Sequence, residues 1–130
     1  MFSKFKTYTS FSAPDIAAIK EFYTQKLGLS IVQDMGDNGV SFQTGGDTSF
    51  LVYIKPNHVA AEFTVLNFMV DDIEASVDEL ISKGVTMEQY DFPGLKTNEK
   101  GIADQMGGDE NGRMAWFKDP AGNIISVGTF

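Results

Sequence analysis

The chain has 130 residues, of which 42% are apolar, 12% aromatic and 22% charged, and this composition excludes a disordered chain and is typical of one globular domain. Eighteen acidic against ten basic residues give a net charge of −8, which repels phosphate backbones and argues against a nucleic-acid partner. Two interpretations of the acidity stay open, namely solubility and attraction of a cationic ligand.

The sequence also excludes a membrane-spanning segment and any site that needs cysteine. No apolar run approaches the roughly 18 residues of a membrane span, and the opening "MFSKFKTYTS" lacks an apolar signal segment. We therefore expect a cytoplasmic protein without a membrane partner. The chain has no cysteine, so disulfides, thiolate metal sites and cysteine nucleophiles are excluded.

Taken in chain order, the first half predicts a strand, a helix and three further strands. A strand is expected at 5–11, and "SAPDIAAIKEFYTQKLGLSI" then shows apolar residues at helical spacing, with Gly28 as the helix stop. Strands at 29–35, 39–43 and 49–55 follow as short apolar runs between turn residues.

The second half repeats this pattern. A strand at 62–70 precedes "VDDIEASVDELISKGVTM", where the Asp-Ile pair that starts the first helix recurs at Asp72. Further strands are expected at 86–90, 113–118 and 124–128. The repeat predicts an α+β fold in which one domain, 1–130, contains two βαβββ modules at about 1–57 and 60–130.

Two connections of the second half differ in character. The turn in "WFKDPAGNIISV" has Asp119 at its start, Pro120 to preset φ and Gly122 where positive φ is needed, so by itself it indicates a hairpin. The segment 93–111 is rich in Gly and charge without a sustained period. We expect a long loop there, either a functional lid or disordered.

Three motifs together resemble the vicinal oxygen chelate superfamily, which includes glyoxalases, extradiol dioxygenases and bleomycin resistance proteins. They are "FYTQKLGL", the Asp-Ile start of the second helix and "GRMAWFKDPAGNIISV", and the resemblance covers nearly the whole chain. It implies that the modules curl into a curved mixed-sheet half-barrel around a cavity, and that two chains pair as a homodimer.

Metal enzymes of that superfamily hold an ion with His or Glu side chains from the first and last strand of each module. Transferred by the motifs, these positions are Tyr8, Leu51, Val65 and Ser126. Leu and Val carry no lone pair, and neutral Tyr and Ser bind divalent cations weakly. We therefore predict no metal and no cofactor.

Side chains along a strand point alternately to its two faces, and this alternation predicts which of them face the cavity. The set is apolar and aromatic with a few hydroxyl and amide groups, which suits a small-molecule ligand, although each member could also be ordinary core. The predicted ligand-binding residues are Tyr8, Ser10, Leu51, Tyr53, Val65, Asn67, Met69, Met114, Trp116 and Ser126.

We predict no catalytic residue. Asp104, Asp109, Glu110 and Asp119 are interpreted as a solvated rim rather than an acid–base pair, although Tyr8 and Tyr53 could serve as general acids. The single histidine, His58, is expected to lie on the solvated surface or to make a turn contact, and the alternative is that it approaches its symmetry mate at a dimer junction.

The leading hypothesis is a metal-free protein of the glyoxalase and bleomycin resistance type that sequesters an aromatic or cationic molecule, as the antibiotic-binding members do. The alternative is a glyoxalase- or dioxygenase-like enzyme whose metal ligands lie at other positions or which uses tyrosine acid–base chemistry. A third possibility is a fold kept for association alone.

Overall fold

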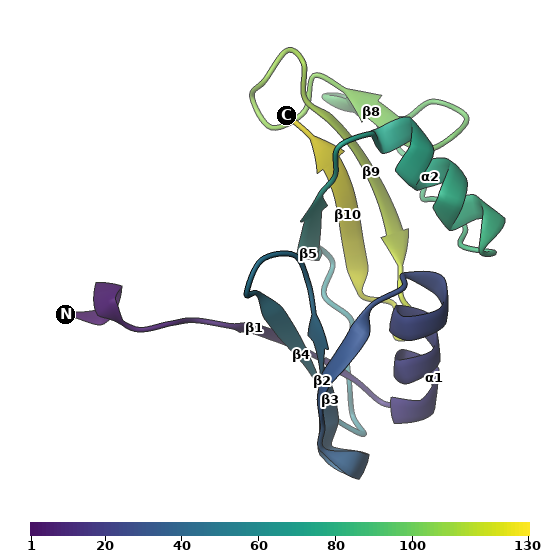
Figure 1. The fold of residues 1–130 in the computed structure, drawn as a ribbon. Coiled ribbons are helices and arrows are strands. Elements are labelled where there is room, and N and C mark those ends of the chain that lie inside the picture. Colours follow the sequence, from purple (N-terminus) through teal and green to yellow (C-terminus); the bar gives the residue numbers. More distant parts are fainter. The chain divides into compact units, whose positions relative to one another are not determined.

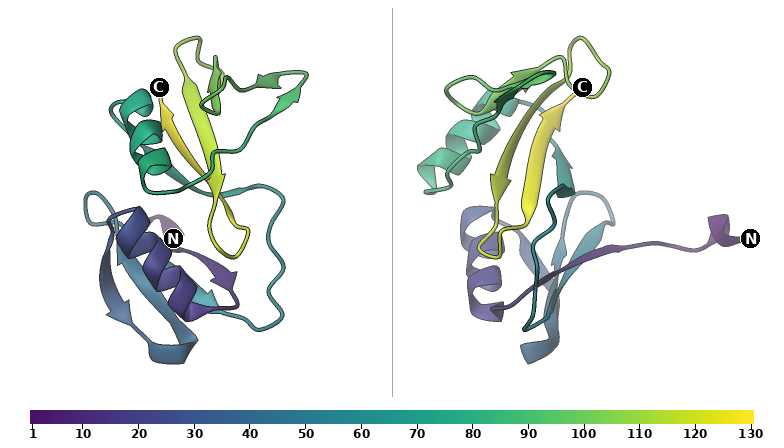
Figure 2. Two further views of the ribbon diagram at one scale, coloured as in Figure 1. Left: turned by 90° about the vertical axis from the view of Figure 1, so that its right-hand side faces the viewer. Right: turned by 180° about the vertical axis from the view of Figure 1, so that it is seen from behind.

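A computed structural model describes all residues from 1 to 130. The chain forms two compact units, Met1–Ala60 and Ala61–Phe130, and each holds one four-stranded mixed sheet with a helix on it (Figures 1 and 2). This confirms the predicted α+β fold. None of its helices has both the length and the apolar character needed to cross a membrane.

The first unit contains one sheet, one α-helix extended by a π-helical turn, and two short 3₁₀ turns. Its sheet order is β1-β4-β3-β2, with β1 parallel to β4 and the other pairs antiparallel. The elements are η1 (Phe2–Lys4), β1 (Thr9–Ala13), α1 (Ile16–Glu21), η2 (Phe22–Lys26), β2 (Ser30–Asp34), η3 (Gly36–Asn38), β3 (Gly39–Gln43) and β4 (Ser49–Ile54).

An aromatic core lies between this sheet and its helix. The π-helical turn, closed by the Leu27 N–H on the Phe22 carbonyl, widens the last turn so that the adjacent residues Phe22 and Tyr23 are both buried. The Tyr23 ring packs against Phe42 and Phe50 with ring centroids 5.0 and 5.4 Å away. The helix begins at Asp15, whose carboxylate accepts from two backbone N–H groups.

The second unit repeats this topology. Its sheet order is β5-β10-β9-β8, and again the first strand runs parallel to the last. Asp72 caps its helix as Asp15 caps the first, which confirms the duplication. The elements are β5 (Thr64–Met69), α2 (Ile73–Ser82), β6 (Asp91–Phe92), β7 (Leu95–Lys96), β8 (Ile102–Asp104), β9 (Arg113–Lys118) and β10 (Ile124–Thr129).

The predicted strand at 86–90 is wrong, and the segment 93–111, expected as a long loop, contains the short strands β7 and β8. Met87 makes only a single bridge to Phe117, and the chain leaves the sheet edge after Glu88, whose N–H donates to the Trp116 carbonyl over 2.8 Å. It returns at Ile102, where β8 takes the place expected for 86–90 beside β9. The outer edge of β9 therefore pairs with two separate segments, Met87–Glu88 and β8.

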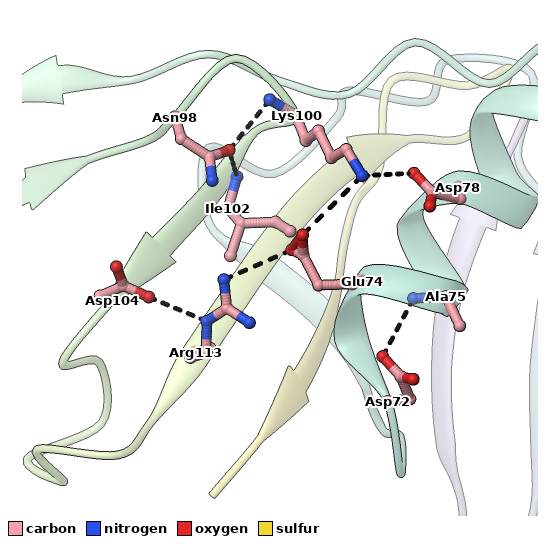
Figure 3. A network of polar contacts seen from close by, with 9 residues as sticks. All are labelled: Asp72, Glu74, Ala75, Asp78, Asn98, Lys100, Ile102, Asp104 and Arg113. Atoms are coloured by element: carbon pink, nitrogen blue, oxygen red, sulfur yellow. Dashed lines mark hydrogen bonds and ion pairs between the residues drawn. The ribbon is translucent and has the colours of Figure 1, made fainter.

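We call the intervening residues 89–101 the excursion. They include the β6–β7 hairpin and a turn in which the Asn98 side chain accepts from the N–H groups of Lys100 and Ile102. Figure 3 shows how the excursion is tied to α2: Lys100 lies 2.9 Å from Asp78 and 3.8 Å from Glu74. The segment is therefore held mainly by its own hydrogen bonds, and surface ion pairs to α2 add little.

Candidate functional site

The face of the first sheet opposite the helix carries small polar and medium-sized apolar side chains. The strand register aligns Ser10, Leu51 and Ser41 in one row across β1, β4 and β3. The next row aligns Tyr53 with Ser12. Because side chains alternate along a strand, the buried residues of the aromatic core occupy the other face.

A hollow of about 310 Å³ lies over part of this open face. Its lining joins the end of the segment before β1, the edge strand β2, the middle of β3 and the first half of β4. The lining residues are Tyr8, Val32, Gln33, Met35, Ser41, Ser49, Phe50 and Leu51. The structure thus brings together Tyr8 and Leu51 from the predicted set, whereas Ser10 and Tyr53 share the face without lining the hollow.

The sequence did not predict that β2 lines the hollow. Val32, Gln33 and Met35 lie on or directly after a strand whose five residues are all exposed, so no buried alternation marks one of its faces. The register also shifts between Ile31 and Gln33, and a bulge of this kind reverses which side chains face inward.

The six remaining predicted residues come from the open face of the second sheet. Asn67, Ser126 and Trp116 are aligned in one row across β5, β10 and β9, with Met69 and Met114 in the next. The Ser126 hydroxyl donates to Asn67 Oδ1 over 2.6 Å, so this buried hydroxyl already has an acceptor. Val65 lies at a register shift in the β5–β10 pairing, because Thr64 pairs with Ile124 and Leu66 pairs with Ile125.

Trp116 is covered by the excursion. The Tyr90 ring meets the indole edge-on at 5.6 Å between centroids, and Phe92 lies 5.9 Å from Tyr90. Partial burial, with a smaller effect of the nearby Glu88 carboxylate, raises the pKa of Tyr90. Tyr90 lies at the end of the strand predicted at 86–90, and Phe92 lies between that strand and the loop expected at 93–111. Neither was included in the predicted ligand-binding set.

The residues at the superfamily's metal positions do not fit a divalent cation. Leu51 and Val65 have no donor atom, Tyr8 is 70% exposed, and the Ser126 hydroxyl donates to Asn67. No three His, Asp or Glu side chains gather closely enough in the chain to hold a metal ion. His58 Nδ1 lies 2.7 Å from the Ser12 hydroxyl, a contact within the first unit.

Three of the four acidic residues considered for catalysis make local contacts, and the fourth, Glu110, is exposed. Asp104 pairs with Arg113 at 2.9 Å, and Asp109 accepts from the Asn111 N–H. Asp119 does not belong to a solvated rim as expected, because only 5% of it is exposed. Its carboxylate accepts from the N–H groups of Ala121 and Asn123 and from the Asn123 amide, since a tight hairpin turn directs these donors inward.

Solved structures with the same fold cover almost the whole chain. A glyoxalase family protein from Enterococcus faecalis has a TM-score of 0.70 at 20% identity, covering 98% of this chain and 99% of that one. TnmS3, an antibiotic binding protein from Streptomyces sp. CB03234, has 0.65 at 23%, covering 97% of both chains. Lactoylglutathione lyase from Agrobacterium tumefaciens has 0.64 at 22%, covering 97% and 93%.

At these identities the structures establish the fold alone. No curated protein sequence matches the chain. The family model for the "Glyoxalase/Bleomycin resistance protein/Dioxygenase superfamily" matches residues 7–127. This range includes both helices, the turn that begins at Asp119 and both sheets except the last two residues of β10. By that match and by its duplicated sheets, the chain belongs to the glyoxalase/bleomycin resistance protein/dioxygenase superfamily.

Proposed function

We propose that this protein binds a small planar aromatic molecule, neutral or cationic, without a metal ion. The observation that carries the proposal is the chemistry of the four superfamily metal positions, which hold Tyr8, Leu51, Val65 and Ser126. With no imidazole or carboxylate there, the positions offer apolar contact, an aromatic ring and hydroxyl groups. Side chains of this kind support affinity through shape and buried area rather than through coordination.

The hollow of the first unit is the part of the molecule that best suits such a ligand. Leu51 and Met35 offer apolar and polarizable contact, and the exposed Tyr8 ring is free to stack on a planar group. Ser41 and Gln33 supply hydrogen-bonding groups for orientation. The similarity in fold to an antibiotic binding protein agrees with this proposal.

Calorimetric titration with proflavine, a planar aromatic cation, tests the proposal. We expect saturable binding that weakens by about tenfold or more in Tyr8→Ala and in Leu51→Ala, because each removes a large contact from the hollow. Val59→Ala is the matched control, since Val59 is exposed and lies outside the hollow. No heat with proflavine or with naphthalenesulfonate, a planar anion, would contradict the proposal.

Elemental analysis of untagged protein separates this function from the enzymatic alternative. We expect no stoichiometric divalent metal after purification without chelators. A stoichiometric ion that is lost on chelation together with a measurable turnover would favour a glyoxalase- or dioxygenase-like enzyme, with metal ligands outside the four positions. We also propose that the protein acts as a homodimer in the cytoplasm.

A further inference from the structure

One row of side chains crosses the open face of the first sheet from β1 to β2. Residues that pair across neighbouring strands carry their side chains on the same face. The strand pairing links, in order, Ser10, Leu51, Ser41 and Gln33. The row therefore has Leu51 near the middle of the sheet and Gln33 at its edge, because β2 is an edge strand. Leu51, Ser41 and Gln33 all line the hollow.

The bulge in β2 brings Gln33 into this row. Ile31 pairs with Phe42 and Gln33 pairs with Ser41, so Val32 is an extra residue between them. Without this extra residue, Val32 would pair with Ser41, and the Gln33 side chain would lie on the helix side of the sheet. The bulge therefore places a polar amide at the hollow.

The next residue, Asp34, holds β2 in this register. Its carboxylate lies 2.8 Å from Lys20 Nζ on α1 and accepts from the Gly36 N–H over 2.9 Å. Because the Asp34 side chain reaches toward the helix, the preceding side chain, that of Gln33, points to the opposite face. An ion pair this exposed adds little stability, but it agrees with the direction that the strand pairing gives to Gln33.

The amide of Gln33 has no hydrogen-bond partner within the protein. The other glutamine of this sheet, Gln43, differs, because its Nε2 donates over 3.1–3.2 Å to carbonyl oxygens of the turn between β3 and β4. These carbonyls belong to Thr44, Gly46 and Thr48. A primary amide presents an acceptor and a donor side by side. The Gln33 amide is therefore available for a ligand with the complementary pair of groups.

The charge and size of the hollow indicate a small neutral ligand. None of the lining residues is charged. Met1–Ala60 contains five basic and five acidic residues, a net charge of 5 − 5 = 0, whereas Ala61–Phe130 contains five basic and thirteen acidic residues, 5 − 13 = −8. The volume of about 310 Å³ lies near the lower end of the range for small-molecule pockets, about 300–1,000 Å³. It therefore suits a single fused ring system.

We propose that the hollow selects an uncharged planar ring system with a hydrogen-bond donor and an acceptor on adjacent atoms, as in a lactam, and that Gln33 recognises this edge. Gln33 Oε1 accepts from the ring N–H and Nε2 donates to the ring carbonyl, while the rings lie over Leu51. Ser41, opposite Gln33 in the row, supplies a hydroxyl for the second lone pair of the ring carbonyl. The inference rests on the function proposed above and narrows its ligand to one chemical class.

Calorimetric titration with carbostyril, a neutral bicyclic lactam, and with N-methylcarbostyril, which lacks the N–H, tests this recognition. We expect carbostyril to bind about fivefold or more tightly than its N-methyl derivative, and Gln33→Met to abolish this preference, because methionine has a similar length and forms neither hydrogen bond. Gln33→Glu keeps the acceptor and loses the donor, so it should retain part of the preference. Gln25→Met is the matched control, since Gln25 is an exposed glutamine outside the hollow, and it should leave the preference unchanged.

The outcomes separate the parts of the inference. Equal affinities for the two ligands in the unaltered protein, or a preference that persists in Gln33→Met, would overturn the role of Gln33. N-methylquinolinium has the same rings with a positive charge, and tighter binding of this cation than of N-methylcarbostyril would overturn the selection of a neutral ligand. Saturable binding of proflavine without binding of carbostyril would overturn the lactam class alone. No heat with any of these compounds or with naphthalenesulfonate would overturn the proposed function as well.

Discussion

In the second unit, the buried Asp119 makes hydrogen bonds within its own turn. Asp119 accepts three hydrogen bonds with its two carboxylate oxygens, and its own N–H donates to the Asn123 carbonyl over 3.0 Å. These contacts close the hairpin between β9 and β10, and Gly122 has the positive φ of 83° that the turn needs. The motif is therefore explained by the turn, and it requires no role in ligand binding.

The pKa of Tyr90 gives a prediction at the residue scale. Burial first, and Glu88 second, raise this pKa above the ordinary tyrosine value, which is about 10. Above pH 10 the unfolded chain therefore releases the phenolic proton while the folded protein keeps it. Because the folded state then binds more protons, the contribution of Tyr90 makes stability fall as pH rises from the unfolded pKa to the folded one.

Ultraviolet titration of tyrosinate measures the pKa of Tyr90 and checks that it is raised. We expect Glu88→Gln to lower the pKa of Tyr90, since it removes the smaller of the two causes, while most of the upward shift remains. Comparison with Tyr90→Phe assigns the transition to this residue. A Tyr90 that titrates at or below the value of free tyrosine would show that the ring is not held against Trp116.

At the scale of elements, the excursion 89–101 is the main departure of the second unit from the first. Ion pairs between partly exposed side chains contribute little, about 0–1 kcal/mol each, so the contacts of Lys100 with Asp78 and Glu74 guide the excursion rather than secure it. Close backbone packing where the excursion rejoins the sheet is a stronger constraint. Gly101 lies there with φ of 83°.

Two glycines of the excursion form a matched pair. Gly94 and Gly101 have nearly the same φ, 84° and 83°, so alanine at either costs about 1–2 kcal/mol of backbone strain. A Cβ at Gly101 would also lie 2.9 Å from both the Glu88 carbonyl oxygen and Met87 Cβ, whereas nothing lies within 4 Å at Gly94. We expect urea unfolding to show that Gly101→Ala loses about 1–3 kcal/mol more than Gly94→Ala. Equal losses would mean that the excursion is not packed against Met87 and Glu88.

At the scale of the whole molecule, charge is divided unequally between similar units. The duplication gives both units the same strand order, yet the net charge of −8 belongs to Ala61–Phe130. The hollow lies in the first unit, which has equal numbers of basic and acidic residues. No acidic side chain lines the hollow, so the acidity would act on a cationic ligand through the electric field of the protein rather than by contact.

This division predicts how salt affects binding. The Debye length falls from about 30 Å at 0.01 M to about 8 Å at 0.15 M salt, so added salt should slow the association of proflavine several-fold and leave its dissociation nearly unchanged. Stopped-flow fluorescence separates the two rates. Association of proflavine that does not depend on salt would assign the acidity to solubility alone.

The sequence by itself determined the duplicated α+β fold, the two capped helices and the turn at Asp119, because these depend on local periodicity and on side chains that bond their own neighbouring backbone. Two residues of the predicted ligand-binding set, Tyr8 and Leu51, line the hollow, and their role in binding stays a prediction. Tertiary structure decided the rest. The strand beside β9 comes from Ile102–Asp104, and β2 reaches the hollow, because strand pairing and bulges depend on contacts between segments distant in the chain, which a local pattern does not record.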